Sequence, residues 1–212
     1  MSKLKPIVPK KKPVVKRPTT PSGEIRIIGG LWKRTKLSVA DFPGLRPTPD
    51  RVRETLFNWL GQDLSGWRCV DAFAGTGALG FEAASRGADH VLMCEQQPAL
   101  VAQLQTTATK LLARMVRIER GDGVGALKRV AAKSIDLVLL DPPFEAVGVA
   151  DAALAAASLA VTDEGFIYLE SSKTLSAEVA EVFGLQVHRF GKAGMVHYHL
   201  LQKLVSKAAE NT

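Results

Sequence analysis

The stretch VDAFAGTGALGFEAASRGA, residues 70–88, joins the end of an apolar strand to the start of a helix. Between the two, Gly75, Gly77 and Gly80 follow the spacing G-x-G-x-x-G. Glycine permits the tight bend that such a turn needs, and it lets a ligand approach the backbone and the positive end of the helix. The stretch predicts a cofactor at a strand-to-helix turn. The glycine pattern alone leaves open whether that cofactor is a dinucleotide or an adenosyl compound.

Apolar strand-like segments alternate with helical patterns through most of the chain. These segments read WRCVDAF, HVLMCE, VRIERGD, IDLVLLDPP, GFIYLES, LQVHRF and MVHYHLLQ. The alternation predicts an α/β fold with a doubly wound, mostly parallel sheet. The last two segments are separated only by GKAG, which is too short for a helical crossover, so we expect an antiparallel hairpin there.

Ahead of this pattern lies a shorter region with its own signals. Residues 1–22 are rich in Pro and Lys, and we expect a disordered basic tail. IRIIGG and LWKRTKLSV predict a basic β-hairpin with its turn at Gly29 and Gly30. A helix is expected in RPTPDRVRETLFNWLG, with Thr48 as its cap, Pro49 in its first position and Gly61 after its end. We therefore divide the chain into a tail (1–22), an extension (23–60), a main domain (61–203) and a C-terminal tail (204–212).

Charge is distributed unevenly along the chain. Residues 1–22 hold seven Lys or Arg and no acid, and residues 23–55 hold seven more against four acids. The remaining residues hold 14 basic and 17 acidic side chains. A basic front ahead of a slightly acidic body favours contact with a polyanion such as nucleic acid. The alternative is a tail that charge merely keeps soluble.

The sequence shows no sign of a membrane span, a secretion signal, a disulfide or a metal site. No apolar run approaches the roughly 20 residues that cross a bilayer, and the N-terminus lacks the apolar segment of a signal peptide, so we expect a cytoplasmic protein. Cys69 and Cys94 both lie in apolar strand-like runs. Buried reduced thiols are therefore expected, and we predict neither a disulfide nor a metal site.

Three acids at strand ends help to choose the cofactor. Asp71, before the first glycine, would repel a pyrophosphate but suits ammonium and sulfonium groups, which favours S-adenosylmethionine over NAD. Glu95 is placed to accept ribose hydroxyls, and Asp122 to accept from the adenine amino group. Each has a plainer alternative: Asp71 as a local acceptor for the glycine loop, Glu95 as a solvated strand end, and Asp122 as an ordinary turn aspartate.

The segment VLLDPPFE, residues 138–145, ends its strand abruptly because two prolines remove consecutive backbone donors. Such a rigid corner suits chemistry on the exocyclic amine of a nucleobase, a poor nucleophile that must be aimed at the methyl donor. The Asp141 carboxylate and the Pro142 carbonyl would accept the two N–H bonds, and Phe144 would stack on the flipped base. The carboxyl end of this strand should lie beside that of the glycine-loop strand.

DAFAGTGALG, Glu95 and DPPF, in this order, resemble the class I S-adenosylmethionine-dependent methyltransferases that act on exocyclic amines. RIIGG, LRPTPDRVRETLFNWL and FAGTGALGFEAASRGA resemble the bacterial 16S ribosomal RNA guanine-N2 methyltransferases, over about residues 24–203. This resemblance implies a Rossmann-like fold with strand order 3-2-1-4-5-7-6, the last strand antiparallel, behind a small RNA-contacting extension. It also implies methylation of guanine-966 within an assembled or nearly assembled small ribosomal subunit rather than naked RNA. We expect the protein to be a monomer.

The same resemblance assigns roles to residues of this sequence. Cofactor-binding roles are implied for Asp71, Phe73, Gly75, Gly77, Glu95 and Asp122, and catalytic roles for Asp141, Pro142 and Phe144.

RNA contacts are expected from basic side chains of the extension, because a phosphate backbone needs several cations on one face. The candidates are Arg26, Lys33, Arg34, Lys36, Arg46, Arg51 and Arg53. Arg51 and Arg53 cannot share one face of a helix, so one of them is expected to pair with Asp50 or Glu54 or to reach the cofactor side. Trp32 either stacks on a base or packs on the core.

His188, His197 and His199 are expected to be surface or sheet residues rather than catalysts.

Three other functions remain open at the level of sequence. An adenine-N6 DNA methyltransferase would use the same DPPF segment, and an NAD-dependent oxidoreductase would use the same glycine loop. A noncatalytic RNA-binding assembly factor could retain the fold.

Overall fold

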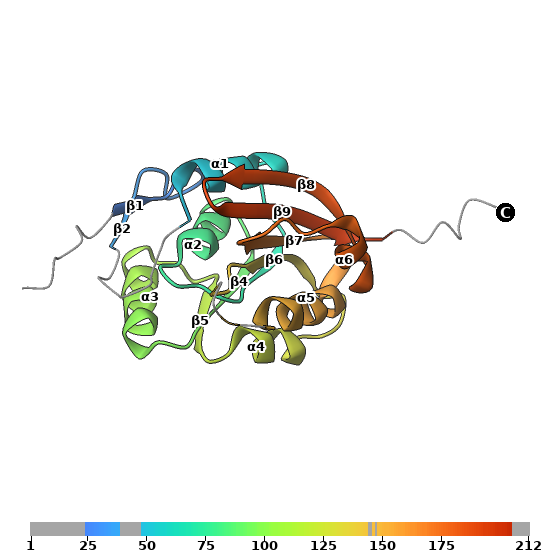
Figure 1. Ribbon diagram of the computed structural model, residues 1–212. Coiled ribbons are helices and arrows are strands. Elements are labelled where there is room, and N and C mark those ends of the chain that lie inside the picture. Colours follow the sequence, from blue (N-terminus) through green and yellow to red (C-terminus); the bar gives the residue numbers. More distant parts are fainter. Residues whose placement is uncertain (1–23, 39–47, 144–145, 147, 205–212) are drawn as a thin grey trace, which may run out of the picture.

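A seven-stranded sheet forms the centre of the molecule (Figure 1). The computed structural model describes residues 24–38, 48–143, 146 and 148–204. The strands of this sheet are β3 (Arg68–Asp71), β4 (His90–Glu95), β5 (Val116–Arg120), β6 (Ile135–Leu140), β7 (Val161–Ser171), β8 (Leu185–Ala193) and β9 (Val196–Lys203). Their order is β5-β4-β3-β6-β7-β9-β8, and β9 is antiparallel to both neighbours. The expected order, 3-2-1-4-5-7-6 in core-strand numbers, is confirmed.

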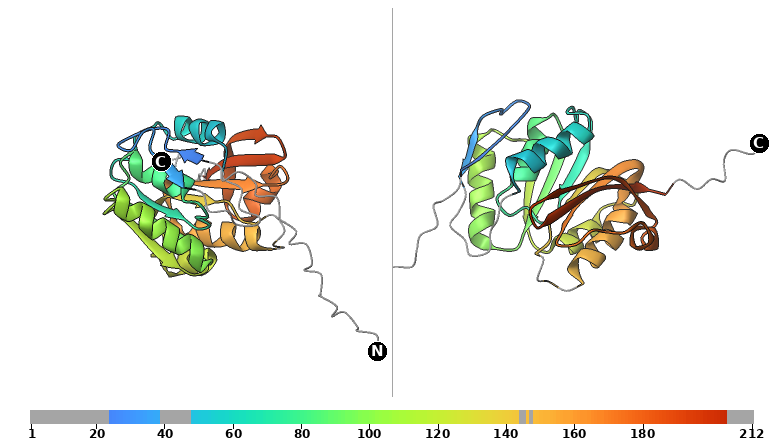
Figure 2. Two further views of the ribbon diagram at one scale, coloured as in Figure 1. Left: turned by 90° about the vertical axis from the view of Figure 1, so that its left-hand side faces the viewer. Right: turned by 45° about the horizontal axis from the view of Figure 1, so that its top comes forward.

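Helices cover both faces of the sheet. They are α1 (Asp50–Trp59), α2 (Ala78–Ser85), α3 (Pro98–Lys110), α4 (Gly123–Arg129), α5 (Val149–Ala160) and α6 (Ala177–Val182). One apolar cluster joins the sheet to α1, α2 and α3, and a second joins it to α4, α5 and α6. Figure 2 shows α1 and α5 on opposite sides of the sheet. None of the helices in the described residues is long and apolar enough to cross a bilayer.

The two closing strands form the expected hairpin, with a shorter turn than the sequence suggested. Ala193 pairs with Val196, so Gly194 and Met195 alone make the turn, and Gly194 has a φ of +63°. A two-residue turn of this kind favours glycine because it requires positive φ. Cys69 and Cys94 are both free and buried in the sheet, as predicted.

The N-terminal hairpin exists, but its strands are shorter than expected. β1 (Glu24–Arg26) pairs with β2 (Lys36–Ser38), and the connection does not turn at Gly29 and Gly30 alone. Instead the backbone continues to Thr35 and is held against α2, because the Leu31 N–H donates to the Ser85 carbonyl at 2.7 Å. A Cβ atom on Gly30 would lie 1.7 Å from that carbonyl oxygen. Contacts with α2 thus replace strand pairing over residues 28–32.

The start of α1 also differs from the prediction. The helix begins at Asp50 with Pro49 as its N-cap, and no side chain caps it. Thr48, the predicted cap, is buried, and its carbonyl accepts from Arg53 Nε at 3.4 Å. The proline therefore precedes the first helical residue, and the Thr48 carbonyl serves a tertiary contact.

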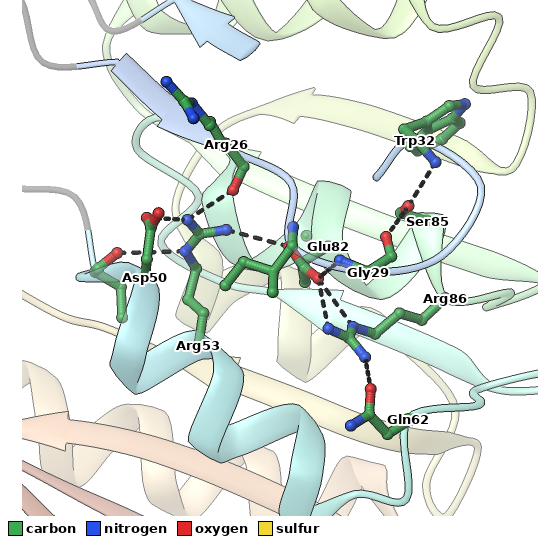
Figure 3. Close-up of polar contacts among 12 residues, drawn as sticks. Arg26, Gly29, Trp32, Asp50, Arg53, Gln62, Glu82, Ser85 and Arg86 are labelled. Atoms are coloured by element: carbon green, nitrogen blue, oxygen red, sulfur yellow. Dashed lines mark hydrogen bonds and ion pairs between the residues drawn. The ribbon is translucent and has the colours of Figure 1, made fainter. Parts of the chain in front are cut away.

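The buried carboxylate of Glu82 on α2 forms hydrogen bonds with both the N-terminal hairpin and α1 (Figure 3). Glu82 is fully buried and accepts backbone N–H groups of Ile28 and Gly29, both at 2.8 Å. It also accepts from Arg53 Nη1 at 3.1 Å and from Arg86 Nε at 2.9 Å. A buried charge is tolerated only when paired and hydrogen-bonded. Two guanidinium groups and two backbone donors meet that requirement here.

Arg53 belongs to this network, and its predicted contact with RNA is a wrong assignment. The side chain is fully buried, so its guanidinium cannot reach a phosphate outside. It donates to the carbonyl of Arg26 at 2.9 Å and pairs with Asp50 at 2.6 Å. The pairing with Asp50 that the sequence offered as an alternative is confirmed.

In the described parts of the extension, 24–38 and 48–60, the buried apolar side chains belong to the core of the main domain. Ile25 and Ile27 of the hairpin and Phe57 of α1 belong to the same apolar cluster as Phe81 and Met93 of the main domain. The division between residues 60 and 61 therefore marks a change of sequence pattern, while the packing continues across it. The predicted N-terminal tail (1–22) and all of the predicted C-terminal tail (204–212) except Leu204 lie outside the described residues.

We predict that Glu82→Gln destabilises the fold severely, because it removes the buried anion that pairs with Arg86 and leaves the buried Arg53 with the exposed Asp50 as its ion-pair partner. Removing one partner of a buried ion pair costs about 3–5 kcal/mol. Glu24→Gln is the matched control, since the side chains of Glu24 and Lys36 are each more than half exposed and solvent weakens their ion pair. Denaturant unfolding measures both losses. Equal effects of the two substitutions would contradict a structural role for Glu82.

A candidate active site at the carboxyl edge of the sheet

The strand register brings the glycine loop and the DPP segment together. β3 lies between β4 and β6, and all three are parallel, so their carboxyl ends meet at one edge of the sheet. Asp71 at the end of β3 pairs with Leu139 of β6, which places Asp141 two residues further along the same edge. The order of strands reverses at β3, and α/β sheets bind ligands at such a point. The expected adjacency of these two strands is confirmed.

The glycine loop is a tight turn held between strand and helix. The Ala74 N–H donates to the Cys94 carbonyl at 2.9 Å, which ties the loop to β4. Gly75 and Gly77 have φ values of +51° and +82°, and Gly77 is the N-cap of α2. A Cβ atom on Gly77 would lie 2.6 Å from Leu104 and 2.7 Å from the Phe81 ring. The backbone at this turn therefore requires glycine for both conformation and space.

Asp71 lies beneath this loop, 1% exposed. Its Oδ2 accepts the Gly80 N–H at 3.0 Å, so the carboxylate fixes the first turn of α2. Burial raises the pKa of the Asp71 carboxyl to about 7, although the N–H groups of Gly80 and Phe73 act in the opposite direction. The observed contact is therefore the plainer one offered by the sequence, in which Asp71 accepts a hydrogen bond from the backbone that follows the glycine loop.

Glu95, at the carboxyl end of β4, touches the same loop. It is half-buried, and its Oε2 accepts the Gly75 N–H at 2.9 Å while Oε1 accepts the Gln97 N–H at 2.8 Å. A carboxylate has about four acceptor positions, so these two bonds leave capacity for further donors. The side chain is more than a solvated strand end, because it positions the loop.

Asp122 stands at the same edge as the cap of α4. Its exposed carboxylate accepts from the Val124 N–H at 3.3 Å and the Gly125 N–H at 2.8 Å. Gly123 allows the start of α4 to touch the end of β3, because a Cβ there would lie 1.9 Å from the Ala72 carbonyl oxygen. This close approach brings Asp122 next to the strand that precedes the glycine loop. The capping contacts of Asp122 are those of an ordinary turn aspartate, the plainer of the two expected roles.

The DPP segment leaves β6 at the centre of this edge. Asp141 is half-buried and Pro142 is buried, whereas Pro143 is exposed. Phe144 lies outside the described residues. Leu140 pairs with Leu169 of β7, so the next residues, Asp141 and Glu170, are neighbours across the two strands.

A buried pair on β7 adds polar groups that the sequence did not reveal. The Tyr168 hydroxyl donates to Glu170 Oε1 at 2.9 Å, and both residues are buried. Burial, followed by the charges of Glu170 and Asp141, raises the pKa of the Tyr168 hydroxyl well above its ordinary value. In the sequence, GFIYLES only indicated a strand, and the buried position of its acid depends on the neighbouring strands.

The basic candidates of the extension divide into three groups. Exposed side chains are found at Arg26, Lys33, Arg34, Lys36 and Arg51. Arg53 is buried, and Arg46 lies outside the described residues. Trp32 is half-buried, packs against the larger apolar cluster and donates its backbone N–H to Ser85 Oγ at 2.9 Å, which favours core packing for this ring.

Comparison with known proteins relates most of this chain to one family. The family model described as Conserved hypothetical protein 95 matches residues 25–202. The chain belongs to this family. Its Escherichia coli relative, named ribosomal RNA small subunit methyltransferase D, is 39% identical over 183 residues, which are 86% of this chain and 91% of that protein. A Haemophilus influenzae protein of the same name is 42% identical over 135 residues, which are 61% of this chain and 70% of that protein.

The fold agrees with a solved structure as well. An Escherichia coli structure described as a methyltransferase has a TM-score of 0.73 and is 36% identical, and the match covers 87% of this chain and 100% of that one. Both the Rossmann-like fold and the family expected from the sequence are thereby confirmed.

We predict that Gly77→Ala is far more damaging than Gly184→Ala. Both glycines have positive φ, which costs a residue with a side chain about 1–2 kcal/mol. Gly184 has no neighbouring atoms within 4 Å of the added Cβ, whereas Gly77 meets Leu104 and Phe81. Urea unfolding should show the larger loss for Gly77→Ala. Equal losses would show that the loop can relax around a methyl group.

Asp71 should make stability depend on pH in an identifiable direction. Because its pKa is raised to about 7 in the folded state from 3.8, the folded protein holds more protons between these values than the unfolded chain. Its contribution therefore weakens as pH rises from about 4 to about 7. Asp71→Asn, which keeps an oxygen acceptor for Gly80, should remove that part of the slope. If the free energy of unfolding changes equally with pH in the parent and in the variant between about pH 4 and about pH 7, the raised pKa of Asp71 is contradicted.

Proposed function

We propose that the protein transfers a methyl group from S-adenosylmethionine to the exocyclic N2 of guanine-966 of 16S ribosomal RNA in the small ribosomal subunit. The observation that carries this proposal is the adjacency of the glycine loop of β3 and the Asp141–Pro142 corner of β6. The family relationship supports it, because the Escherichia coli relative is named as a small-subunit ribosomal RNA methyltransferase.

The residues around the loop fit an adenosyl cofactor. Gly75 and Gly77 place no side chain between the loop backbone and a ligand, and a Cβ atom on Gly77 would collide with Leu104 and Phe81. Glu95 has acceptor capacity for ribose hydroxyls, and Asp122 has the same capacity for an adenine amino group. The acids at these strand ends disfavour a pyrophosphate, which argues for S-adenosylmethionine over NAD. When bound, S-adenosylmethionine supplies a methyl group activated by a sulfonium charge.

Asp141 and Pro142 provide what the base amine requires. The amine of guanine is a weak nucleophile because its lone pair is delocalised into the ring. Acceptors on the Asp141 carboxylate and the Pro142 carbonyl orient the two N–H bonds, so that the lone pair points toward the methyl group. The consecutive prolines make this corner rigid. Positioning of this kind can lower a barrier by roughly 7–11 kcal/mol. Phe144 follows in sequence as a stacking partner for the base.

Exposed cations of the extension supply the sequence-independent part of RNA binding. Arg26 on β1 and Lys36 on β2 lie opposite each other in the strand register, and Arg51 is exposed in the first turn of α1. Lys33 and Arg34 extend this basic surface along the connection between the two strands. Each phosphate contact should make binding more sensitive to salt.

We predict that Asp141→Asn lowers the methylation rate at least about 100-fold, because an amide offers one acceptor oxygen instead of two and places donors beside the amine. The assay uses radiolabelled S-adenosylmethionine and small subunits from a strain that lacks the gene. Mass spectrometry of the RNA nucleosides identifies the methylated base. Calorimetry with S-adenosylhomocysteine should give an unchanged affinity for the variant.

Two results would overturn the proposal. One is undiminished methylation by Asp141→Asn. The other is a methylated adenine in duplex DNA, with no label in small subunits, under the same conditions.

A further inference from the structure

The β8–β9 hairpin reaches the same edge of the sheet as the candidate active site. Because β9 runs antiparallel to β7 and Ser171 pairs with His197, the start of β9 lies beside the carboxyl end of β7. The turn at Gly194 and Met195 therefore projects at the edge where β3 and β6 end. Figure 1 shows the arrowheads of β7 and β8 pointing in the same direction.

This end of the hairpin exposes large apolar side chains. Phe190 is 46% exposed and Met195 is 77% exposed. An exposed aromatic ring beside a candidate active site needs an explanation, whereas a scattered exposed aliphatic side chain does not.

The Phe190 ring contacts two imidazole rings of β9. Its centroid lies 5.0 Å from that of His199 and 5.9 Å from that of His197. His197 Nδ1 is hydrogen-bonded to Thr174 Oγ1 at 2.8 Å, and His199 Nε2 accepts the Leu175 N–H at 3.0 Å. Burial lowers the pKa of His199, which favours the neutral ring that this acceptor role requires. We call Phe190, His197 and His199 the aromatic platform.

Two lysines border the aromatic platform. Phe190 pairs with His199 and Lys192 pairs with His197, so all four residues share one face of the hairpin. Lys192 is exposed. Lys173 is exposed in the loop that carries the hydrogen-bonding partners of both histidines. The adjoining helix α6 contributes two exposed acids, Glu178 and Glu181.

We propose that the aromatic platform, with Lys173 and Lys192, binds a single-stranded nucleotide that flanks the target base. The base would stack on the exposed face of Phe190, and its phosphate would lie near the ammonium groups. This inference rests on the proposed function. Proteins recognise unpaired RNA through aromatic stacking combined with cations along the backbone. The position of the platform at the catalytic edge places it within reach of a strand whose target base has been flipped out.

The test compares Phe190→Ala, Phe190→Tyr and Lys192→Ala on small subunits from a strain that lacks the gene. Phe190→Ala should raise KM about tenfold, since loss of one stacked base weakens binding by that order or more. Phe190→Tyr should restore the parental KM because it restores the ring. Lys192→Ala should reduce the slope of log affinity against log salt by about one. Val182→Ala on α6 is the control, because Val182 is 79% exposed and lies outside the platform.

A photoreactive benzoylphenylalanine at position 190 identifies the occupant. Crosslinking to 16S ribosomal RNA supports the inference, and crosslinking to a ribosomal protein alone overturns it. A parental KM for Phe190→Ala also overturns it, as does a loss of thermal stability with an unchanged KM. These failures differ from failure of the proposed function, which would appear as an active Asp141→Asn enzyme.

Discussion

The pairing of β3 with β6 is the constraint on which the functional interpretation depends. The glycine loop follows β3, and two prolines follow Asp141 at the end of β6. The two strands are neighbours although 67 residues of sequence lie between the paired residues Asp71 and Leu139. Parallel pairing makes both strands finish at one edge. The Asp141–Pro142 corner thus lies beside the glycine loop. Either segment alone would be an ordinary end of a strand.

A second constraint fixes the extension against this arrangement. Glu82 is two turns or less from the glycine loop, on a helix that is buried along its whole length. By accepting from Ile28, Gly29 and Arg53, it joins the hairpin and α1 to the helix that begins at Gly77. The exposed cations of the extension are therefore held at a fixed distance from the glycine loop. Arg86 completes the charge balance and stacks over the Phe57 ring, 4.8 Å from its centroid.

Periodicity and turn chemistry predicted the sheet well, because a strand buried on both faces requires an apolar run and a sharp turn requires glycine or proline. The glycine loop, the hairpin of β8 and β9, and the meeting of Asp71 with the end of β6 all follow from such local signals and from the topology of parallel sheets. Arg53 shows where this reasoning ends. Its sequence context is a basic stretch on a helix, and only the tertiary position of Glu82 makes it an internal residue. The same holds for Asp71, whose depth beneath the loop depends on the packing of α2, and for Glu170, which is buried between β6 and β9.

Together these features describe a candidate active site at the carboxyl edge of the sheet, an extension attached through α2, and an aromatic platform on the β8–β9 hairpin. The most direct test of the central claim is a crystal structure with S-adenosylhomocysteine and guanosine bound. The account predicts the sulfur above the glycine loop, with the Asp141 carboxylate and the Pro142 carbonyl facing it across the guanine amine. A sulfur atom bound away from the carboxyl ends of β3 and β6, or an Asp141 side chain directed away from it, would contradict the account.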